Sequence, residues 1–248
     1  MKNYILIFGV VSYFLLIFAG CNKDDTQELK DLTLLDYKKL NIPETSGLSF
    51  NKQENTFLTV SDNSDRVYII STDGEVLDSL IYDGQNLEGV VYDANSFRIF
   101  VVEEQTNEVI QLDTIGNETG RFTIDLNNTE PNHGIEGITF NPLNGHLYVV
   151  SEKSPAILFE LTTDGEIVAQ HQLGFMEDYS SVYFDGPGNS LWILSDQSEL
   201  LVRCDLSGQP LEWFSTGLKD AEGVVVDSAN SKVWIITDSG NTLYSFSF

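Results

Sequence analysis

EGITFNPLNGHLYVVSE, residues 136–152, is the stretch that decides the fold. A short run of β-branched and aromatic residues is followed by the turn at 142–145, and a second apolar run then ends on the acidic Glu152. β-Branched and aromatic residues suit a buried strand, whereas Pro, Asn and Gly favour a tight turn between two strands. The segment therefore predicts a β-hairpin that begins and ends on a glutamate.

This hairpin is one of five similar copies along the chain. Each copy has a small residue near the start of its first run, and an acidic residue follows fifteen positions later in every case. The small anchor residues are Gly47, Gly89, Gly137, Ser181 and Gly223. The acidic residues that follow them are Asp62, Glu104, Glu152, Asp196 and Asp238. Successive anchors are 42, 48, 44 and 42 residues apart, so the chain repeats one structural unit.

Each hairpin is followed by a third strand-like run, and in the first four copies a Gly-containing turn leads to a more polar fourth run. Units of roughly 40 to 50 residues with four antiparallel strands are typical of β-propellers. The last copy ends after three strands, and residues 31–38 form a strand-like run ahead of the first copy. We predict an all-β fold, a five-bladed β-propeller closed by this N-terminal strand.

Two other architectures are alternatives. A six-bladed ring with one unrecognised copy would need roughly forty more residues. A stacked β-solenoid usually has shorter units that do not return through four antiparallel strands. Five blades is the number that the chain length favours.

The N-terminus has the layout of an export signal. Lys2 precedes an apolar stretch over 4–19, which is short for a membrane-spanning helix, and Gly20 and Cys21 follow. Residues 18–21, FAGC, resemble the lipobox of bacterial lipoproteins, although Phe18 departs from the usual small or aliphatic residue. An uncleaved anchor is the alternative.

We therefore expect a signal peptide over 1–20, a lipidated Cys21 with a flexible tether over 21–30, and one propeller domain over 31–248. The protein would be exported and lipid-anchored at the cell-envelope membrane, in the outer membrane or facing the periplasm. Cys204 would then be the one remaining thiol, which excludes an internal disulfide and suggests a buried packing residue.

The formal net charge of −25 excludes nucleic acid as a natural partner, because phosphate binding requires the opposite sign. It also excludes adhesion to an anionic membrane by charge, so the lipid anchor is the expected membrane contact. We expect a monomer.

Strand direction should bring two sets of acids to one face of the ring. The first and second strands of a blade are antiparallel, so the start of one lies beside the end of the other. Three copies begin the first strand with Glu88, Glu136 or Glu222, and the other two carry an acid two residues earlier, Glu44 or Asp178. We therefore predict a mouth of the central channel ringed by ten carboxylates: Glu44, Asp62, Glu88, Glu104, Glu136, Glu152, Asp178, Asp196, Glu222 and Asp238.

So many like charges are easier to hold together if a cation compensates them. Carboxylate oxygens without a Cys or His cluster favour Ca²⁺ or Mg²⁺ over zinc or copper, and the loose geometry of Ca²⁺ suits ligands from several blades. The ten acids are thus candidate metal ligands for Ca²⁺, with Mg²⁺ as the second choice. The alternative is that they accept backbone N–H bonds at strand ends.

Short motifs recur in all five copies, at residues 44–48, 86–90, 102–104, 134–138, 151–155, 178–182, 194–198 and 221–224. With these motifs the chain resembles the SdiA-regulated family of bacterial envelope proteins. The resemblance runs from about residue 40 to the end of the chain. It implies a propeller in the cell envelope, distantly similar to NHL-type propellers, and supplies no catalytic residues.

Two functions follow from these expectations. The first is a binding module that holds a cation at the acidic mouth and presents that face to a small-molecule or protein ligand. The second is a calcium-dependent hydrolase of lactonase, esterase or phosphoesterase type, in which the metal polarises a substrate oxygen. His133 is a candidate base or ligand near the mouth, or an ordinary loop histidine. No nucleophile elbow or Cys/His pair is present in the sequence, which favours binding.

Overall fold

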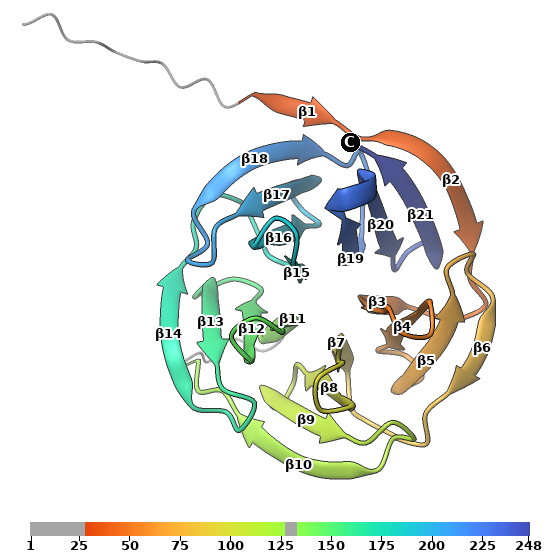
Figure 1. Cartoon of the computed structure of the whole chain (residues 1–248), viewed down its shortest axis with the longest axis vertical. Helices are drawn as coiled ribbons and strands as arrows, with labels where there is room; N and C mark the ends of the chain where they lie inside the picture. The colour runs from red at the N-terminus through yellow and green to blue at the C-terminus, as the bar shows by residue number, and fades with distance from the viewer. Residues whose placement is uncertain (1–27, 127–132) are drawn as a thin grey trace, which may run out of the picture.

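The computed structural model describes residues 28–126 and 133–248, which form a ring of five β-sheets (Figure 1). The predicted signal peptide and Cys21 lie outside the described residues. Within the described ranges, none of the helices has the length and apolar character needed to cross a membrane.

Each sheet is one blade. From the axis outward, its first three strands follow one another in chain order, and in blades 1 to 4 so does the fourth. Blade 1 contains β3 (Thr45–Asn51), β4 (Thr56–Ser61), β5 (Arg66–Ser71) and β6 (Val76–Ser79). Blade 2 contains β7 (Leu87–Asp93), β8 (Arg98–Glu103), β9 (Glu108–Leu112) and β10 (Glu118–Thr123). Blade 3 contains β11 (Ile135–Asn141), β12 (His146–Ser151), β13 (Ile157–Leu161) and β14 (Ile167–Gln172).

Blade 4 contains β15 (Ser181–Asp185), β16 (Ser190–Ser195), β17 (Leu200–Cys204) and β18 (Pro210–Ser215). Blade 5 contains β19 (Ala221–Asp227), the 3₁₀ turn η1 (Ser228–Asn230), β20 (Lys232–Thr237), β21 (Thr242–Ser247) and, from the other end of the chain, β2 (Thr33–Lys39).

The ring closes through the N-terminal strand. β2 pairs antiparallel with β21, from Thr33 opposite Ser247 to Lys39 opposite Thr242. The predicted five-bladed ring and its closing strand are therefore confirmed, and the six-bladed alternative is wrong.

A short additional strand precedes this closure. β1 (Leu29–Asp31) pairs in parallel with β18 and gives the sheet of blade 4 a fifth strand. The Lys30 ammonium lies 2.7 Å from the carboxylate of Glu212 on that strand. β1 thus takes up the last two residues of the segment 21–30 that was expected to be a flexible tether, and the N-terminal segment runs across both blade 4 and blade 5 (Figure 1).

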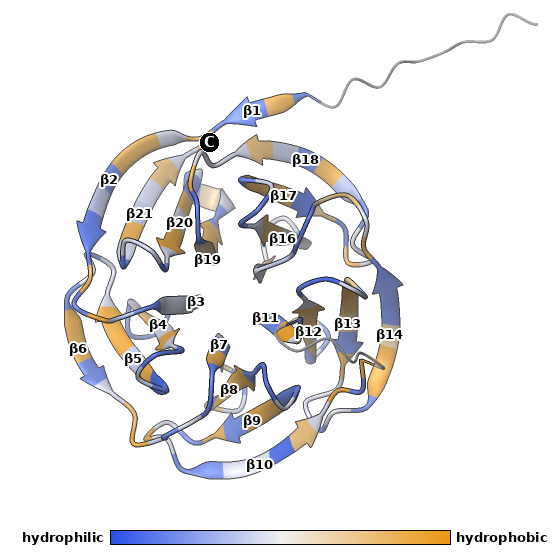
Figure 2. Ribbon diagram, turned by 180° about the vertical axis from the view of Figure 1, so that it is seen from behind, coloured by the Kyte–Doolittle hydropathy of each residue, from blue (hydrophilic) through white to orange (hydrophobic). Residues whose placement is uncertain are grey.

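Burial falls from the inner to the outer strands. All residues of β11 are buried, whereas β10 and β14 are largely exposed or half-buried. In Figure 2 the outer strands carry hydrophilic residues over much of their length. This gradient agrees with the more polar fourth run of each repeat.

Aromatic residues fill the space between blades. Trp192 of blade 4 is buried in a cluster with Val224 and Val233 of blade 5, and its ring lies 5.1 Å from that of Phe248. The Cys204 thiol is also buried, as expected for a packing residue.

The anchor glycines lie where inner strands of neighbouring blades approach most closely. A Cβ on Gly47 would stand 2.7 Å from the backbone oxygen of Glu88 in the next blade, and a Cβ on Gly137 would stand 2.6 Å from the backbone nitrogen of Val182. Gly223 meets the backbone of Gly47 in the same way and completes the circle. The small anchors of the repeat are thus required by backbone packing around the axis.

Candidate functional site

The described residues contain a polar cavity of about 240 Å³ where the first strands begin and the second strands end. All ten predicted carboxylates line it. Between them lie Thr45, Ser46, Ser180 and Gln197. We call this cavity the acidic mouth. His133 is not among its lining residues.

A β-bulge aims a glutamate into the acidic mouth in three blades. The pairing of the first two strands slips between Leu87 and Gly89, between Ile135 and Ile138, and between Ala221 and Gly223. An extra residue in one strand disrupts the ladder locally and redirects its side chain. The glutamates at these slips are Glu88, Glu136 and Glu222. The two blades with a serine beside the anchor differ: blade 4 has no such slip, whereas blade 1 has one between Ser46 and Leu48.

Glu104 is held by hydrogen bonds on both oxygens. The side-chain amide of Asn86 donates to Oε2 over 2.7 Å, and the backbone N–H of Gly134 donates to Oε1 over 3.2 Å. The same Asn86 amide also donates to Oε1 of Glu88 over 3.2 Å. One asparagine therefore fixes two acids of the mouth.

Glu136 is buried but accepts no hydrogen bonds of this kind among the described residues. Its side chain is 7% exposed, and the described part of the chain provides no hydrogen-bond donor to its carboxylate. Burial, followed by the charges of Glu88 and Glu104, raises its pKa well above the usual range for a glutamate. Its position is unfavourable for an isolated carboxylate and favourable for a ligand of a cation.

Three carboxylates come close enough together to share an ion. One ligand oxygen from each of Glu104, Glu136 and Glu152 lies within 4.8 Å of the other two. These residues belong to blades 2 and 3, so the cluster lies to one side of the ring axis. Oxygen donors alone suit a hard cation such as Ca²⁺ or Mg²⁺.

Other acids of the mouth are also driven towards their neutral forms. Burial is the largest cause of the raised pKa of Glu88, about 8, and the charges of Asp62 and Glu104 add to it against a hydrogen bond from Ser46. Burial and then the charge of Glu44 raise the pKa of Asp62 to about 6. Without a cation, the acidic mouth cannot carry all of its negative charges at neutral pH.

The acids of blade 4 have a different environment. The carboxylate of Asp178 accepts hydrogen bonds from the Ser195 hydroxyl and from the backbone N–H of Gln197. Asp196 accepts from the backbone N–H of Asp220. These two residues fit the alternative that acids at strand ends cap loops. Glu136 thus differs from its neighbours: among the described residues it accepts no hydrogen bond, whereas Glu104, Asp178 and Asp196 do.

Among the described residues, Lys153 contacts a carboxylate of the acidic mouth, although it is not itself one of the lining residues. The Lys153 ammonium lies 2.6 Å from Oε1 of Glu152, and the side chain of Lys153 is 27% exposed. Sequence reasoning missed this residue. A signal was available, because the residues that follow the repeated acid in the other four copies are uncharged: Asn63, Gln105, Gln197 and Ser239.

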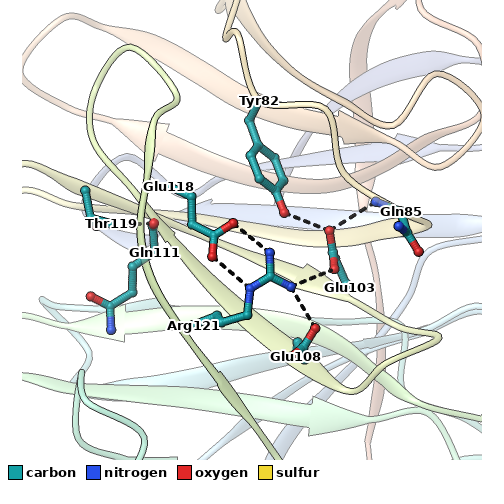
Figure 3. A network of polar contacts seen from close by, with 8 residues as sticks. All are labelled: Tyr82, Gln85, Glu103, Glu108, Gln111, Glu118, Thr119 and Arg121. Carbon is teal, nitrogen blue, oxygen red and sulfur yellow. Dashed lines mark hydrogen bonds and ion pairs between the residues drawn. The ribbon is translucent and has the colours of Figure 1, made fainter.

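Glu103, the neighbour of Glu104, faces away from the mouth into a separate network (Figure 3). The Tyr82 hydroxyl donates to its Oε1 over 2.8 Å, and the backbone N–H of Gln85 donates to the same oxygen over 3.1 Å. Arg121 lies 3.9 Å from the second oxygen. Because Gln85 directly precedes Asn86, this network fixes the segment that carries the amide donor of Glu104 and Glu88.

Comparison with known proteins gives a family and a fold. The family model of the SdiA-regulated proteins matches residues 32–247. Among solved structures, a gluconolactonase from Xanthomonas campestris superposes with a TM-score of 0.57 at 14% identity, covering 89% of this chain and 96% of the other.

Two further structures are similar at comparable identity. A chain of the nidogen/laminin complex has a TM-score of 0.59 at 20% identity, covering 82% of this chain and 75% of the other. An inactive virginiamycin B lyase from Staphylococcus aureus, solved with quinupristin, has a TM-score of 0.50 at 18% identity, covering 88% of this chain and 75% of the other. At these identities, the likenesses show the propeller fold alone.

Proposed function

The chain belongs to the SdiA-regulated family, and we propose that its acidic mouth binds a divalent cation and presents it to a small-molecule or protein ligand. The observation that carries this proposal is the buried carboxylate of Glu136, which lacks a hydrogen-bond donor among the described residues and lies beside Glu104 and Glu152. A cation between these three groups would compensate their charges and fill the coordination that the protein leaves open.

Ca²⁺ is the preferred ion. It accepts six to eight oxygen ligands in flexible geometry, whereas Mg²⁺ requires a near-ideal octahedron and gives up its water reluctantly. The three glutamates come from two blades, and waters or ligand oxygens would complete the shell. That open part of the shell is where a bound ligand would meet the metal.

Calorimetric titration of Ca²⁺ into chelator-treated protein tests the proposal. We expect measurable heat, near 1:1 stoichiometry and a higher melting temperature with Ca²⁺, because a ligand of the folded state stabilises it. Glu136→Gln should lose both effects, while Glu54→Gln, an exposed acid in the turn after β3, should keep them. The absence of heat and of a melting shift in the wild-type protein would contradict cation binding.

A hydrolase is the second candidate, and the raised pKa of Glu88 favours it. In the metal-free mouth a carboxyl with a pKa of about 8 is largely protonated at neutral pH, and it would serve as a general acid if it keeps that proton when the metal is bound. Turnover of lactones or phosphate esters with added Ca²⁺, lost in Glu88→Gln, would support this candidate. No turnover on a broad panel of such substrates would rule out the hydrolase and leave ligand binding as the function.

We also propose that the protein is exported and lipid-anchored through Cys21, on the support of the lipobox-like residues 18–21. Labelling of cells with a fatty acid tests the anchor. The label should enter the wild-type protein and the Cys204→Ser variant and should be lost in Cys21→Ser. Equal labelling of all three would contradict the assignment.

A further inference from the structure

One carboxylate of the acidic mouth already has a cationic partner from the protein itself. The Lys153 ammonium makes an ion pair of 2.6 Å with Oε1 of Glu152, one of the three carboxylates that come within 4.8 Å of each other. Two interactions therefore compete for the Glu152 carboxylate. One is the ion pair with Lys153, and the other is a cation shared with Glu104 and Glu136.

We propose that Lys153 is a built-in competitor of the divalent cation and sets the affinity of the site for it. The inference rests on the proposed function, since it concerns the same three glutamates. Its basis is the ion pair on a candidate ligand, together with the buried Glu136 carboxylate, to which the described residues donate no hydrogen bond.

The Lys153 ammonium and a Ca²⁺ ion cannot both bind the Glu152 carboxylate tightly at the same time. A Ca²⁺ ion bound to Glu152 would lie about 2.3–2.6 Å from a carboxylate oxygen. With the ammonium in contact with the same carboxylate, the two positive charges would be only about 5 Å apart, where repulsion is strong in a partly buried site. Metal binding therefore requires Lys153 to withdraw, or it proceeds against the repulsion of the ammonium.

The surroundings of Lys153 support this placement. Burial opposes its charge, but the ion pair with Glu152 and the nearby carboxylates of Asp178 and Glu136 favour it. The Lys153 ammonium is thus attracted by several carboxylates of the acidic mouth as well as by its ion-pair partner Glu152. With 27% of its side chain exposed, it has room to turn outward.

The repeat itself does not need a lysine here. In the four other copies the equivalent residue is an uncharged polar side chain, and the strand ends in the same way. Lys153 is therefore an addition to blade 3, located where the carboxylates come closest together. Such a competitor would keep the site empty at low Ca²⁺ and would give the weak affinity, about 10⁻⁴–10⁻³ M, that is typical of extracellular calcium modules.

The test is calorimetric titration of Ca²⁺ into chelator-treated wild-type protein and into Lys153→Met. Lys153→Met should bind Ca²⁺ at least tenfold more tightly than the wild type, and Lys153→Gln serves as a second neutral variant if the first folds poorly. Lys153→Arg, which keeps the charge, should retain weak binding. Lys52→Met, in the turn after β3 at the opposite end of blade 1, makes the same change in net charge away from the mouth and should leave the affinity unchanged.

The outcomes separate the two proposals. If the wild type binds Ca²⁺ and the neutral variants bind with the same affinity, the competitor role is overturned and the cation site stands. Equal tightening in Lys52→Met would also overturn it, because net charge alone would then be the cause. If the wild type does not bind Ca²⁺, the proposed cation site itself fails, whatever the Lys153 variants do.

Discussion

Asn86 donates its side-chain amide to Oε2 of Glu104 over 2.7 Å, so a residue at the entry to β7 fixes a carboxylate at the end of β8. The backbone of Asn86 has a φ of 50°, a left-handed conformation that Asn and Gly adopt most readily. The amide is thus presented to the acidic mouth by a special backbone position. Orienting a ligand in this way is what outer hydrogen-bond partners of metal sites do.

Replacing Asn86 by Gly should weaken Ca²⁺ binding by roughly tenfold, within the range seen when outer hydrogen-bond partners of metal ligands are removed. Gly keeps the left-handed backbone, so the change isolates the loss of the amide. Asn55→Gly is a matched control, because Asn55 also has a positive φ, 56°, and lies in the exposed turn between β3 and β4. Calorimetry that finds equal affinities for the wild type and Asn86→Gly would contradict the positioning role.

Glu136→Gln should stabilise the protein when metal is absent. Gln cannot ionise, so at a pH above the raised pKa of Glu136, where the carboxyl must carry a charge among other carboxylates, the expected gain is about 1 kcal/mol, or roughly 2–4 °C in melting temperature for a domain of this size. Thermal denaturation in chelator measures it, with Glu54→Gln as the surface control. A lower melting temperature for Glu136→Gln in chelator would show that the carboxylate is already compensated within the protein.

The metal-free protein should lose stability as the pH rises. In the folded state the pKa of Asp62 is raised to about 6 and that of Glu88 to about 8, so the folded protein binds more protons than the unfolded chain between about pH 4 and 8. The free energy of unfolding must therefore fall across this window. Carboxyls with lowered pKa values, such as Glu212 beside Lys30, change the stability only at pH values below this window.

Denaturation of the metal-free protein at several pH values checks this sign. Saturating Ca²⁺ should flatten the decline, because the ion favours the ionised acids. A stability that rises from pH 5 to 8 in chelator would mean that the acids of the mouth are ionised at little cost.

Gly89→Ala should destabilise the ring by about 1–3 kcal/mol, the usual cost of overpacking. An added Cβ would collide with the backbone oxygen of Glu136 in the next blade. Gly120→Ala is the matched control, since a Cβ there would come no closer than 3.7 Å to any described residue other than its two chain neighbours. Denaturant unfolding of both variants measures the difference, and equal stability would refute close packing of the inner strands.

The fold and the membership of the acidic mouth could both be predicted from the sequence, for one physical reason. A repeat places equivalent residues at equivalent points of a ring, so Glu152 and Asp238 had to share a face once the strand directions were known. Trp234 of blade 5 shows the same regularity in the packing between blades, since its ring lies 5.5 Å from that of Phe57 in blade 1.

What differs between copies could not be obtained from the repeat. The donor role of Asn86 depends on its left-handed backbone, and the separation of Asp178 from Glu136 depends on which loops supply N–H groups. The parallel pairing of β1 with β18 leaves no periodic signal in a segment of three residues. Lys153 was visible in the sequence, but its contact with Glu152 depends on side-chain packing.

The most direct test of the cation site is an anomalous difference map from crystals of the protein grown with Ca²⁺. We predict one peak in the acidic mouth, off the ring axis, about 2.3–2.6 Å from carboxylate oxygens of Glu104, Glu136 and Glu152. A mouth without a peak at saturating Ca²⁺, or a peak held only by other residues, would contradict the account.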